Sequence, residues 1–161
     1  MLAMRHVVGV SEMKVSRSEG DIIVTHSLGS CIGVAIYDAK AGVGGLLHYQ
    51  LPLSRENPDR AQENPCMYAD TGIPHLFKAA YSLGADKKRM IVKVAGGARV
   101  LDNNNFFNIG QRNYIALKKI FWKNGVFIQG EDVGGESWRT MHLEIGTGRV
   151  WIKNSQGMYD L

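Results

Sequence analysis

The chain has 161 residues, 45% of them hydrophobic, which is enough for one compact domain with a substantial core. Its 19 Lys and Arg residues against 15 Asp and Glu residues give a formal net charge of +4, and the scatter of the basic residues argues against nucleic-acid binding. No apolar stretch approaches the ~18 residues that a membrane span needs, and the first residues do not resemble a signal peptide, so we expect neither membrane insertion nor secretion.

The two cysteines, Cys31 and Cys66, indicate a reducing, cytoplasmic setting. They are too few for a disulfide framework, and no Cys-x-x-Cys or His-x-x-x-His spacing indicates zinc. In a reducing compartment a thiol stays available for chemistry. Cys66 with His75 would offer only two metal ligands, so we expect no metal site.

Hydrophobic alternation predicts a chain rich in β-strands. The expected strands are 5–10, 21–25, 32–37, 43–49, 90–95, 126–129, 137–145 and 149–153. Residues 50–68, which contain three of the four prolines, are predicted to form an irregular loop at the edge of a site.

Two segments have helical periodicity. The first is predicted to begin at Asp70 or Thr71, to have Pro74 in its first turn and to end at Gly84. The second is predicted to begin at Asn108 and to end at 124–125. Because hairpins imply largely antiparallel pairing, the expected fold is α+β, a layered α/β sandwich with two main helices, built as a single domain over residues 1–161.

A predicted β-hairpin brings together the candidate catalytic pair, Cys31 and His48. Pairing Ile36 with Val43 places Cys31 directly opposite His48, on the same face of the sheet, with Cβ atoms roughly 4.5–5.5 Å apart. A shift by one residue would place them on opposite faces. A neighbouring imidazole can accept the thiol proton and stabilise the reactive thiolate.

Three neighbours complete this candidate site. Thr25 ends the preceding strand, and its hydroxyl or carbonyl could accept the other imidazole N–H of His48. The backbone N–H groups of Gly29 and Ser30 could stabilise an oxyanion.

Each member of the pair also has an ordinary structural interpretation. A cysteine by itself is ordinarily a small buried residue, and a histidine in an apolar strand is ordinarily a hydrogen-bonded core residue. The same pair of residues would also serve a peptidase or a transglutaminase.

The motifs resemble those of one family, the CheD chemoreceptor glutamine deamidases of bacterial chemotaxis. The pattern is Thr25, then Cys31 six residues later within Leu-Gly-Ser-Cys, then His48 seventeen residues after that. Further pieces resemble the family in the same order: 20–21, 33–38, 44–45, 94–97, 108–113, 132–135 and 147–150.

The resemblance implies a protein-glutamine glutaminase acting on selected glutamines in the cytoplasmic helices of methyl-accepting chemoreceptors. It assigns Cys31 as the nucleophile that forms a thioester, His48 as acid and base, and Thr25 as the residue that holds the imidazole, and it implies that no cofactor is needed. It also implies a fold similar to the catalytic domain of bacterial cytotoxic necrotizing toxins, and a CheC-type phosphatase as a further partner. An interaction module that regulates this phosphatase with little catalysis is the alternative function. Segments 50–68 and 103–113 are the candidates for holding the receptor helix.

Overall fold

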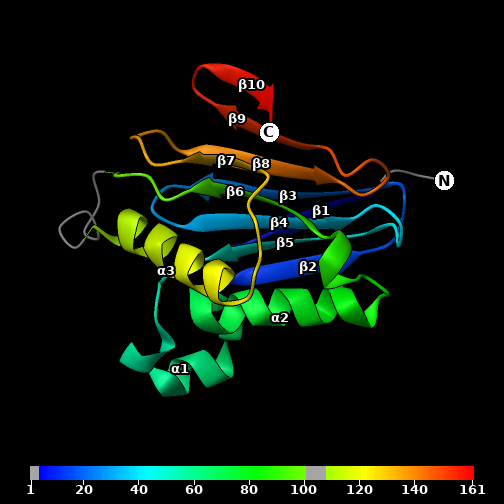
Figure 1. The fold of residues 1–161 in the computed structure, drawn as a ribbon. Coiled ribbons are helices and arrows are strands. Elements are labelled where there is room, and N and C mark those ends of the chain that lie inside the picture. Colours follow the sequence, from blue (N-terminus) through cyan, green and yellow to red (C-terminus); the bar gives the residue numbers. More distant parts are fainter. Residues whose placement is uncertain (1–3, 101–107) are drawn as a thin grey trace.

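In the computed structural model, which describes residues 4–100 and 108–161, ten strands form two five-stranded sheets (Figure 1). The first sheet has the order β1 (Met4–Val8), β3 (Asp21–Leu28), β8 (Arg139–Glu144), β9 (Val150–Asn154) and β10 (Gly157–Asp160). The second has the order β2 (Glu12–Ser16), β5 (Val43–Tyr49), β4 (Ile32–Asp38), β6 (Ile91–Gly96) and β7 (Gly130–Val133). Only the β1–β3 and β6–β7 pairs within these described residues are parallel. The predicted layered α+β fold with largely antiparallel sheets is therefore confirmed.

Two long helices, α2 (Ala69–Ser82) and α3 (Ile109–Lys123), lie together on one side of the strands, and the β9–β10 hairpin lies on the other side (Figure 1). The helices pack on β2, β4 and β5 of the second sheet. No helix in the described ranges is both long enough and apolar enough to cross a membrane.

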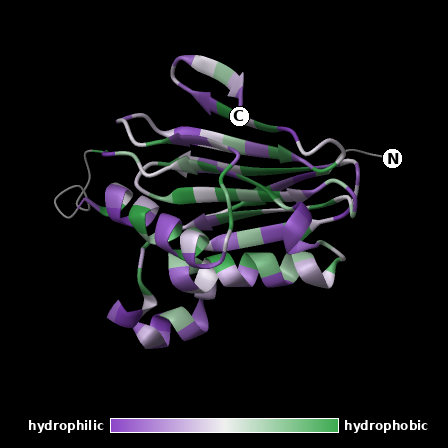
Figure 2. Cartoon of the chain, in the orientation of Figure 1, coloured by the Kyte–Doolittle hydropathy of each residue, from purple (hydrophilic) through white to green (hydrophobic). Residues whose placement is uncertain are grey.

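The second sheet is buried on both faces, which explains its continuous apolar strands. Every residue of β4 and β5 is buried. Val34 and Leu47 face the helices, whereas Ala35 and Leu46 face the first sheet. A strand covered on both faces carries an apolar run instead of an alternating one. Figure 2 shows this apolar concentration along the central strands, whereas the helices have mixed faces.

The segment predicted to be an irregular loop, 50–68, is instead largely helical. It contains η1 (Ser54–Glu56), α1 (Pro58–Glu63) and η2 (Pro65–Met67). Side chains of Asn57 and Asn64 accept backbone hydrogen bonds at the starts of α1 and η2, and a proline follows each cap. This is the normal chemistry of a helix start, so the prolines begin helices here instead of excluding them.

The start of α2 and the position of β7 also differ from the predictions. Asp70 does not cap α2, because its carboxylate accepts hydrogen bonds from the backbone and side chain of Ser54. Thr71 donates to the Pro65 carbonyl, and the helix begins at Ala69 with Pro74 inside it. The predicted strand at 126–129 is wrong, since the paired residues are Gly130–Val133.

Two edge strands, β2 and β10, were not predicted, because both strands are short and most of their residues are polar or exposed. The predicted second helix is confirmed as α3, with Asn108 before it and Asn124 after it. A further short helix, η3 (Lys87–Arg89), precedes β6.

Candidate active site

Cys31 and His48 lie on the same face of the second sheet, in a register that differs from the predicted one. Ile36 pairs with Gly45 and Gly33 pairs with His48, so the predicted pairing of the hairpin was wrong by two residues. β4 extends one residue beyond its predicted end, to Asp38, which pairs with Val43 and whose carboxylate accepts N–H groups of the turn. A shift of two residues preserves the face, so Cys31 is a diagonal neighbour of His48, at a Cα separation of roughly 7–8 Å.

The face shared by Cys31 and His48 points toward the first sheet. Cys31 is partly exposed and packs against the cluster of apolar side chains between the two sheets. His48 is fully buried in the same layer. The pair therefore lies at the rim of the core that joins the sheets, with only the thiol partly accessible.

The hydrogen bonds of Thr25 determine which tautomer His48 adopts. The Thr25 hydroxyl donates its single hydrogen to the Val8 carbonyl, at 2.7 Å. Its oxygen is also 2.7 Å from Nδ1 of His48. Since a hydroxyl has one hydrogen, Thr25 Oγ1 accepts from the imidazole, and Nδ1 carries the proton. In the neutral ring, Nε2 therefore carries the lone pair.

Burial keeps His48 neutral. The loss of solvent lowers the pKa of His48 from 6.5 to about 4. Its Nε2 atom is buried and has no hydrogen-bond partner among the described residues. Buried polar atoms are rarely left unpaired in folded proteins, and an exception calls for an explanation. A neutral imidazole with an available lone pair beside a cysteine is the arrangement that a general base requires.

Backbone hydrogen bonds hold the loop that carries Cys31. Ser27 adopts a left-handed conformation with φ of 59°, and Gly29 N–H donates to the Ser27 carbonyl at 3.0 Å. Gly97 N–H donates to the Cys31 carbonyl at 2.9 Å, and Ala98 N–H donates to the Gly29 carbonyl at 2.8 Å. Because the Gly29 N–H is already used in this turn, the prediction that it serves as an oxyanion donor is not supported.

Gly96 makes the close approach to Cys31 possible. Its φ is +112°, and a Cβ atom at this position would lie 2.2 Å from the Cys31 carbonyl oxygen. Any other residue would be strained and would also clash. The glycine pair 96–97 thus positions the backbone of the candidate nucleophile.

Asn113 connects the segments that carry the two catalytic candidates. It is fully buried, and its side-chain N–H₂ donates to the carbonyls of Ser30, at 2.9 Å, and Gln50, at 3.0 Å. The Tyr49 hydroxyl donates to the Asn113 carbonyl at 2.7 Å. Sequence reasoning named this residue only as the end of segment 103–113 and gave it no structural role. The sequence feature that could have indicated its role is a polar amide at an inward position of the predicted second helix.

Arg139 is a second buried residue that sequence reasoning missed. It donates to the carbonyls of Gly96, at 3.3 Å, and Gly134, at 2.7 Å, and pairs with Asp132 at 3.2 Å. It therefore ties both glycine pairs, 96–97 and 134–135, to β8. The sequence feature that could have indicated this role is a charged residue two positions before Met141, and therefore on the same inward face of the strand.

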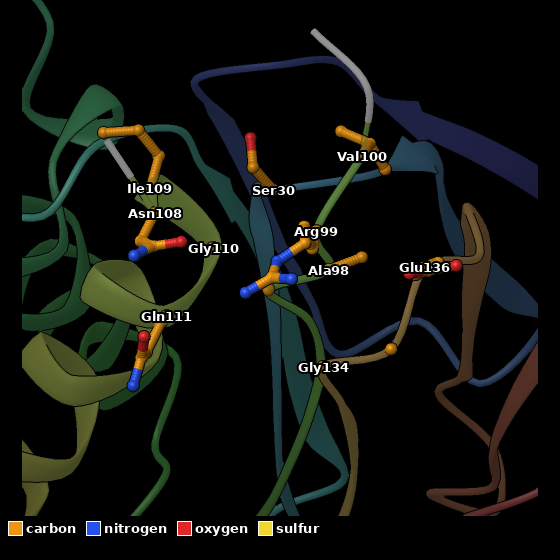
Figure 3. Close-up of a pocket in the computed structure, with 12 residues that line it drawn as sticks. Ser30, Ala98, Arg99, Val100, Asn108, Ile109, Gly110, Gln111, Gly134 and Glu136 are labelled. Atoms are coloured by element: carbon orange, nitrogen blue, oxygen red, sulfur yellow. The ribbon is translucent and has the colours of Figure 1, made fainter. Parts of the chain in front are cut away.

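A cavity of about 340 Å³ lies beside the loop of Cys31. The first turn of α3 lies on one side of it and Ser30 and Arg99 on the other, with the side chain of Arg99 extending toward α3 (Figure 3). Part of the predicted receptor-holding segment 103–113 lines this cavity, namely residues 108–111. Residues 103–107 of that segment lie outside the described residues, and none of the cavity's lining comes from 50–68.

The remaining candidates are separate from this site. Cys66 is buried in the core beneath the helices, where burial raises the pKa of its thiol, and His75 is exposed on α2. Glu131 and Asp132 lie within β7 and accept hydrogen bonds from Tyr114 and Arg139. Over residues 4–100 and 108–161, no three His, Cys, Asp or Glu side chains are grouped so as to hold a metal ion.

Comparison with known proteins identifies the family of this chain. The family model described as CheD chemotactic sensory transduction matches residues 50–154. A relative from Syntrophus aciditrophicus (strain SB), named probable chemoreceptor glutamine deamidase CheD 1, is 60% identical over 151 residues, which cover 94% of each chain. A relative from Solibacter usitatus (strain Ellin6076), named probable chemoreceptor glutamine deamidase CheD, is 49% identical over 92% of this chain and 88% of its own. Among solved structures, the Neisseria meningitidis protein NMB0706 aligns with a TM-score of 0.49 and 10% identity over 83% of this chain and 63% of its own. The chain belongs to the CheD family.

Proposed function

We propose that Cys31, His48 and Thr25 form the catalytic site with which this protein deamidates glutamines of chemoreceptors. The protein is a chemoreceptor glutamine deamidase, an amidohydrolase that converts these glutamines to glutamates, as the names and high identity of its relatives support. The observation that carries the site assignment is the fixed tautomer of His48, which leaves its Nε2 lone pair available on the face shared with Cys31.

In the first half of the reaction, Nε2 of His48 accepts the proton of the Cys31 thiol as sulfur attacks the carbon of the glutamine side-chain amide. The carbonyl oxygen becomes an oxyanion, for which one well-placed N–H donor is typically worth about 3 kcal/mol of barrier. The imidazolium then returns its proton, through Nε2, to the amide nitrogen. The C–N bond breaks, ammonia leaves, and a thioester joins the substrate to Cys31.

In the second half, a water molecule attacks the thioester. His48 Nε2 accepts one proton from this water and gives it to the departing sulfur of Cys31. The products are glutamate and the regenerated thiol, so atoms and charge balance over the cycle. Thr25 accepts the Nδ1–H hydrogen bond throughout both halves, which keeps Nε2 directed to the reaction.

The resting site is proposed to hold a thiol and a neutral imidazole rather than a preformed ion pair. Burial lowers the pKa of His48 to about 4, and its partner Thr25 is neutral, so no carboxylate stabilises an imidazolium. Proton transfer then coincides with attack on the amide, which limits the reactivity of Cys31 toward other electrophiles.

Four finer expectations belong to the same proposal. The whole chain, residues 1–161, acts as one deamidase domain in the cytoplasm, without a cofactor. A CheC-type phosphatase binds it in addition to the receptor. Pull-down with such a phosphatase tests this last point independently of catalysis.

The test of the proposed function is mass spectrometry of a receptor cytoplasmic fragment incubated with the protein. Wild type is expected to convert specific glutamines to glutamates, and Cys31→Ala is expected to convert none. Cys66→Ala is the matched control, because it removes a thiol that is buried away from the site and should retain activity. Conversion by Cys31→Ala would contradict the nucleophile assignment.

A negative result with wild type would change the conclusion about function. If several folded receptor fragments show no conversion while the phosphatase is captured, the interaction-module alternative is favoured. The same dyad could also cleave or cross-link substrates, and these products differ in mass from a simple deamidation.

A further inference from the structure

A second cavity, of about 400 Å³, opens next to the loop that leads to Cys31. Its lining includes the basic side chains of Arg5, His26, His142 and Lys153, a group we call the basic pocket, and no acidic residue. Sequence reasoning left His26 without a role.

The basic pocket lies on the outer face of the first sheet. Along β8 and β9, Met141 and Ile152 point into the core between the sheets. The side chains at alternate positions, including His142 and Lys153, therefore point outward. The long helices pack on the other sheet, so this face is not the one that they cover (Figure 1).

The positive charge of this pocket is largely uncompensated. Arg149 pairs with Asp160 at 2.8 Å, and Arg139 pairs with Asp132. In contrast, Arg5 and Lys153 form no ion pair with any residue that the structure describes. Isolated surface cations are ordinarily only solvated, whereas these two converge on one cavity.

His142 forms an ordered part of the pocket wall. It is 6% exposed, and its ring stacks on Trp151 with centroids 4.7 Å apart and planes inclined by 6°. Burial lowers the pKa of His142, the hydrogen bond with the Trp151 carbonyl opposes this shift, and the charges of Arg5 and Lys153 lower the pKa further. The charges of Arg5 and Lys153 therefore act together on this wall of the cavity.

Trp138 connects the basic pocket to the catalytic loop. Its side chain lines the cavity and remains 54% exposed. Its ring atoms lie 2.7–3.0 Å from the position that a Cβ atom on Gly29 would occupy. Gly29 is two residues before Cys31, so an exposed indole lies between the pocket and the loop of the nucleophile.

We propose that the basic pocket binds a carboxylate-bearing segment of the receptor helix next to the glutamine being deamidated, with Trp138 packing on its apolar side chains. This inference rests on the proposed function of the Cys31 site. A glutamine side chain offers few atoms to grip, so a protein substrate must be held by contacts outside its amide. A cavity lined with cations and an aromatic ring is complementary to an acidic, partly apolar peptide.

The test is a charge-reversal pair with a matched control. Arg5→Glu combined with Lys153→Glu is expected to raise KM for a receptor fragment about tenfold or more, with kcat changed less than about twofold, since two exposed ion pairs are worth up to ~1 kcal/mol each. Lys87→Glu combined with Lys88→Glu makes the same change of net charge at exposed positions of η3, and should leave KM unchanged. The effect of the first pair should shrink at high salt.

Binding measured without turnover separates this proposal from the proposed function. The receptor fragment is titrated into Cys31→Ala protein with and without the Arg5→Glu and Lys153→Glu changes. Weaker binding with the reversed charges supports the pocket even if wild type shows no deamidation. Equal binding and equal KM would overturn the pocket while leaving the deamidase assignment intact. In the Arg5→Glu and Lys153→Glu variant that keeps Cys31, iodoacetamide labelling of Cys31 at an unchanged rate confirms that the charge reversals leave the site folded.

Discussion

Replacing Thr25 by Val tests the central feature of the site, the tautomer of His48. Valine has nearly the shape of threonine but no hydroxyl, so it removes two hydrogen bonds of 2.7 Å, one to Val8 and one to His48. Leaving a buried polar group unpaired costs about 1–3 kcal/mol, so the free energy of unfolding should fall by about 2–6 kcal/mol.

The catalytic effect of Thr25→Val should exceed what lost stability explains. Without an acceptor at Nδ1, the imidazole of His48 favours the tautomer with its proton on Nε2, which cannot accept the thiol proton. In a serine protease the loss of tautomer control lowers kcat about 10⁴-fold. Because Thr25 is neutral, we expect a smaller loss, about 10²-fold to 10³-fold in kcat, with KM nearly unchanged.

The assay compares ammonia release from a receptor fragment by wild type, Thr25→Val and Thr25→Ser. Serine keeps the hydroxyl and should retain activity within about tenfold, because its Oγ can accept from His48 while donating to Val8. Denaturant unfolding confirms that each variant is folded under the assay conditions. Folded Thr25→Val with kcat within about threefold of wild type would refute the reasoning, as would equal losses in Val and Ser.

Three further predictions follow from burial and close contact. Asn113→Ala removes the side-chain donor from the partly buried carbonyls of Ser30 and Gln50, and should lower the free energy of unfolding by about 1–3 kcal/mol in total and kcat at least about tenfold, measured by denaturant titration and ammonia release. Because the pKa of His48 falls from 6.5 to about 4 on folding, the unfolded chain binds more protons in this range, so stability should decrease by about 3 kcal/mol as the pH falls from 6.5 to 4. The contribution of His48 is measured as the difference between wild type and His48→Gln in how the free energy of unfolding changes with pH. The acid limb of kcat/KM should lie near pH 4 instead of 6.5. Gly96→Ala should destabilise the fold by about 1–3 kcal/mol and slow alkylation of Cys31, and unchanged unfolding would contradict the close contact.

The sequence predicted that Thr25, Cys31 and His48 lie together better than it predicted the register of the hairpin that joins two of them. A register error of two residues left Cys31 and His48 on the same face, because side chains alternate with a period of two. The bonds of the Asp38 carboxylate with the turn, which accompany the true register, are tertiary and local details that alternation does not encode.

The residues that support the trio were the ones that sequence reasoning missed. Asn113 acts through the backbone carbonyls of segments far away in the chain, and Arg139 does the same for two glycine pairs. Every residue has a backbone carbonyl, so the sequence does not show which residues a side chain binds when it donates to main-chain atoms. The proline-rich segment 50–68 failed for a different reason, because proline is permitted in the first turn of a helix and was interpreted only as a breaker.

The hydrogen bond between Thr25 and His48 joins strands that belong to different sheets. The orientation proposed for the imidazole of His48 therefore depends on both sheets, because a displacement of one sheet against the other by about an ångström would lengthen this 2.7 Å contact beyond hydrogen-bond range. In the proposed mechanism, a change in the relative position of the two sheets would lower activity without any contact with Cys31.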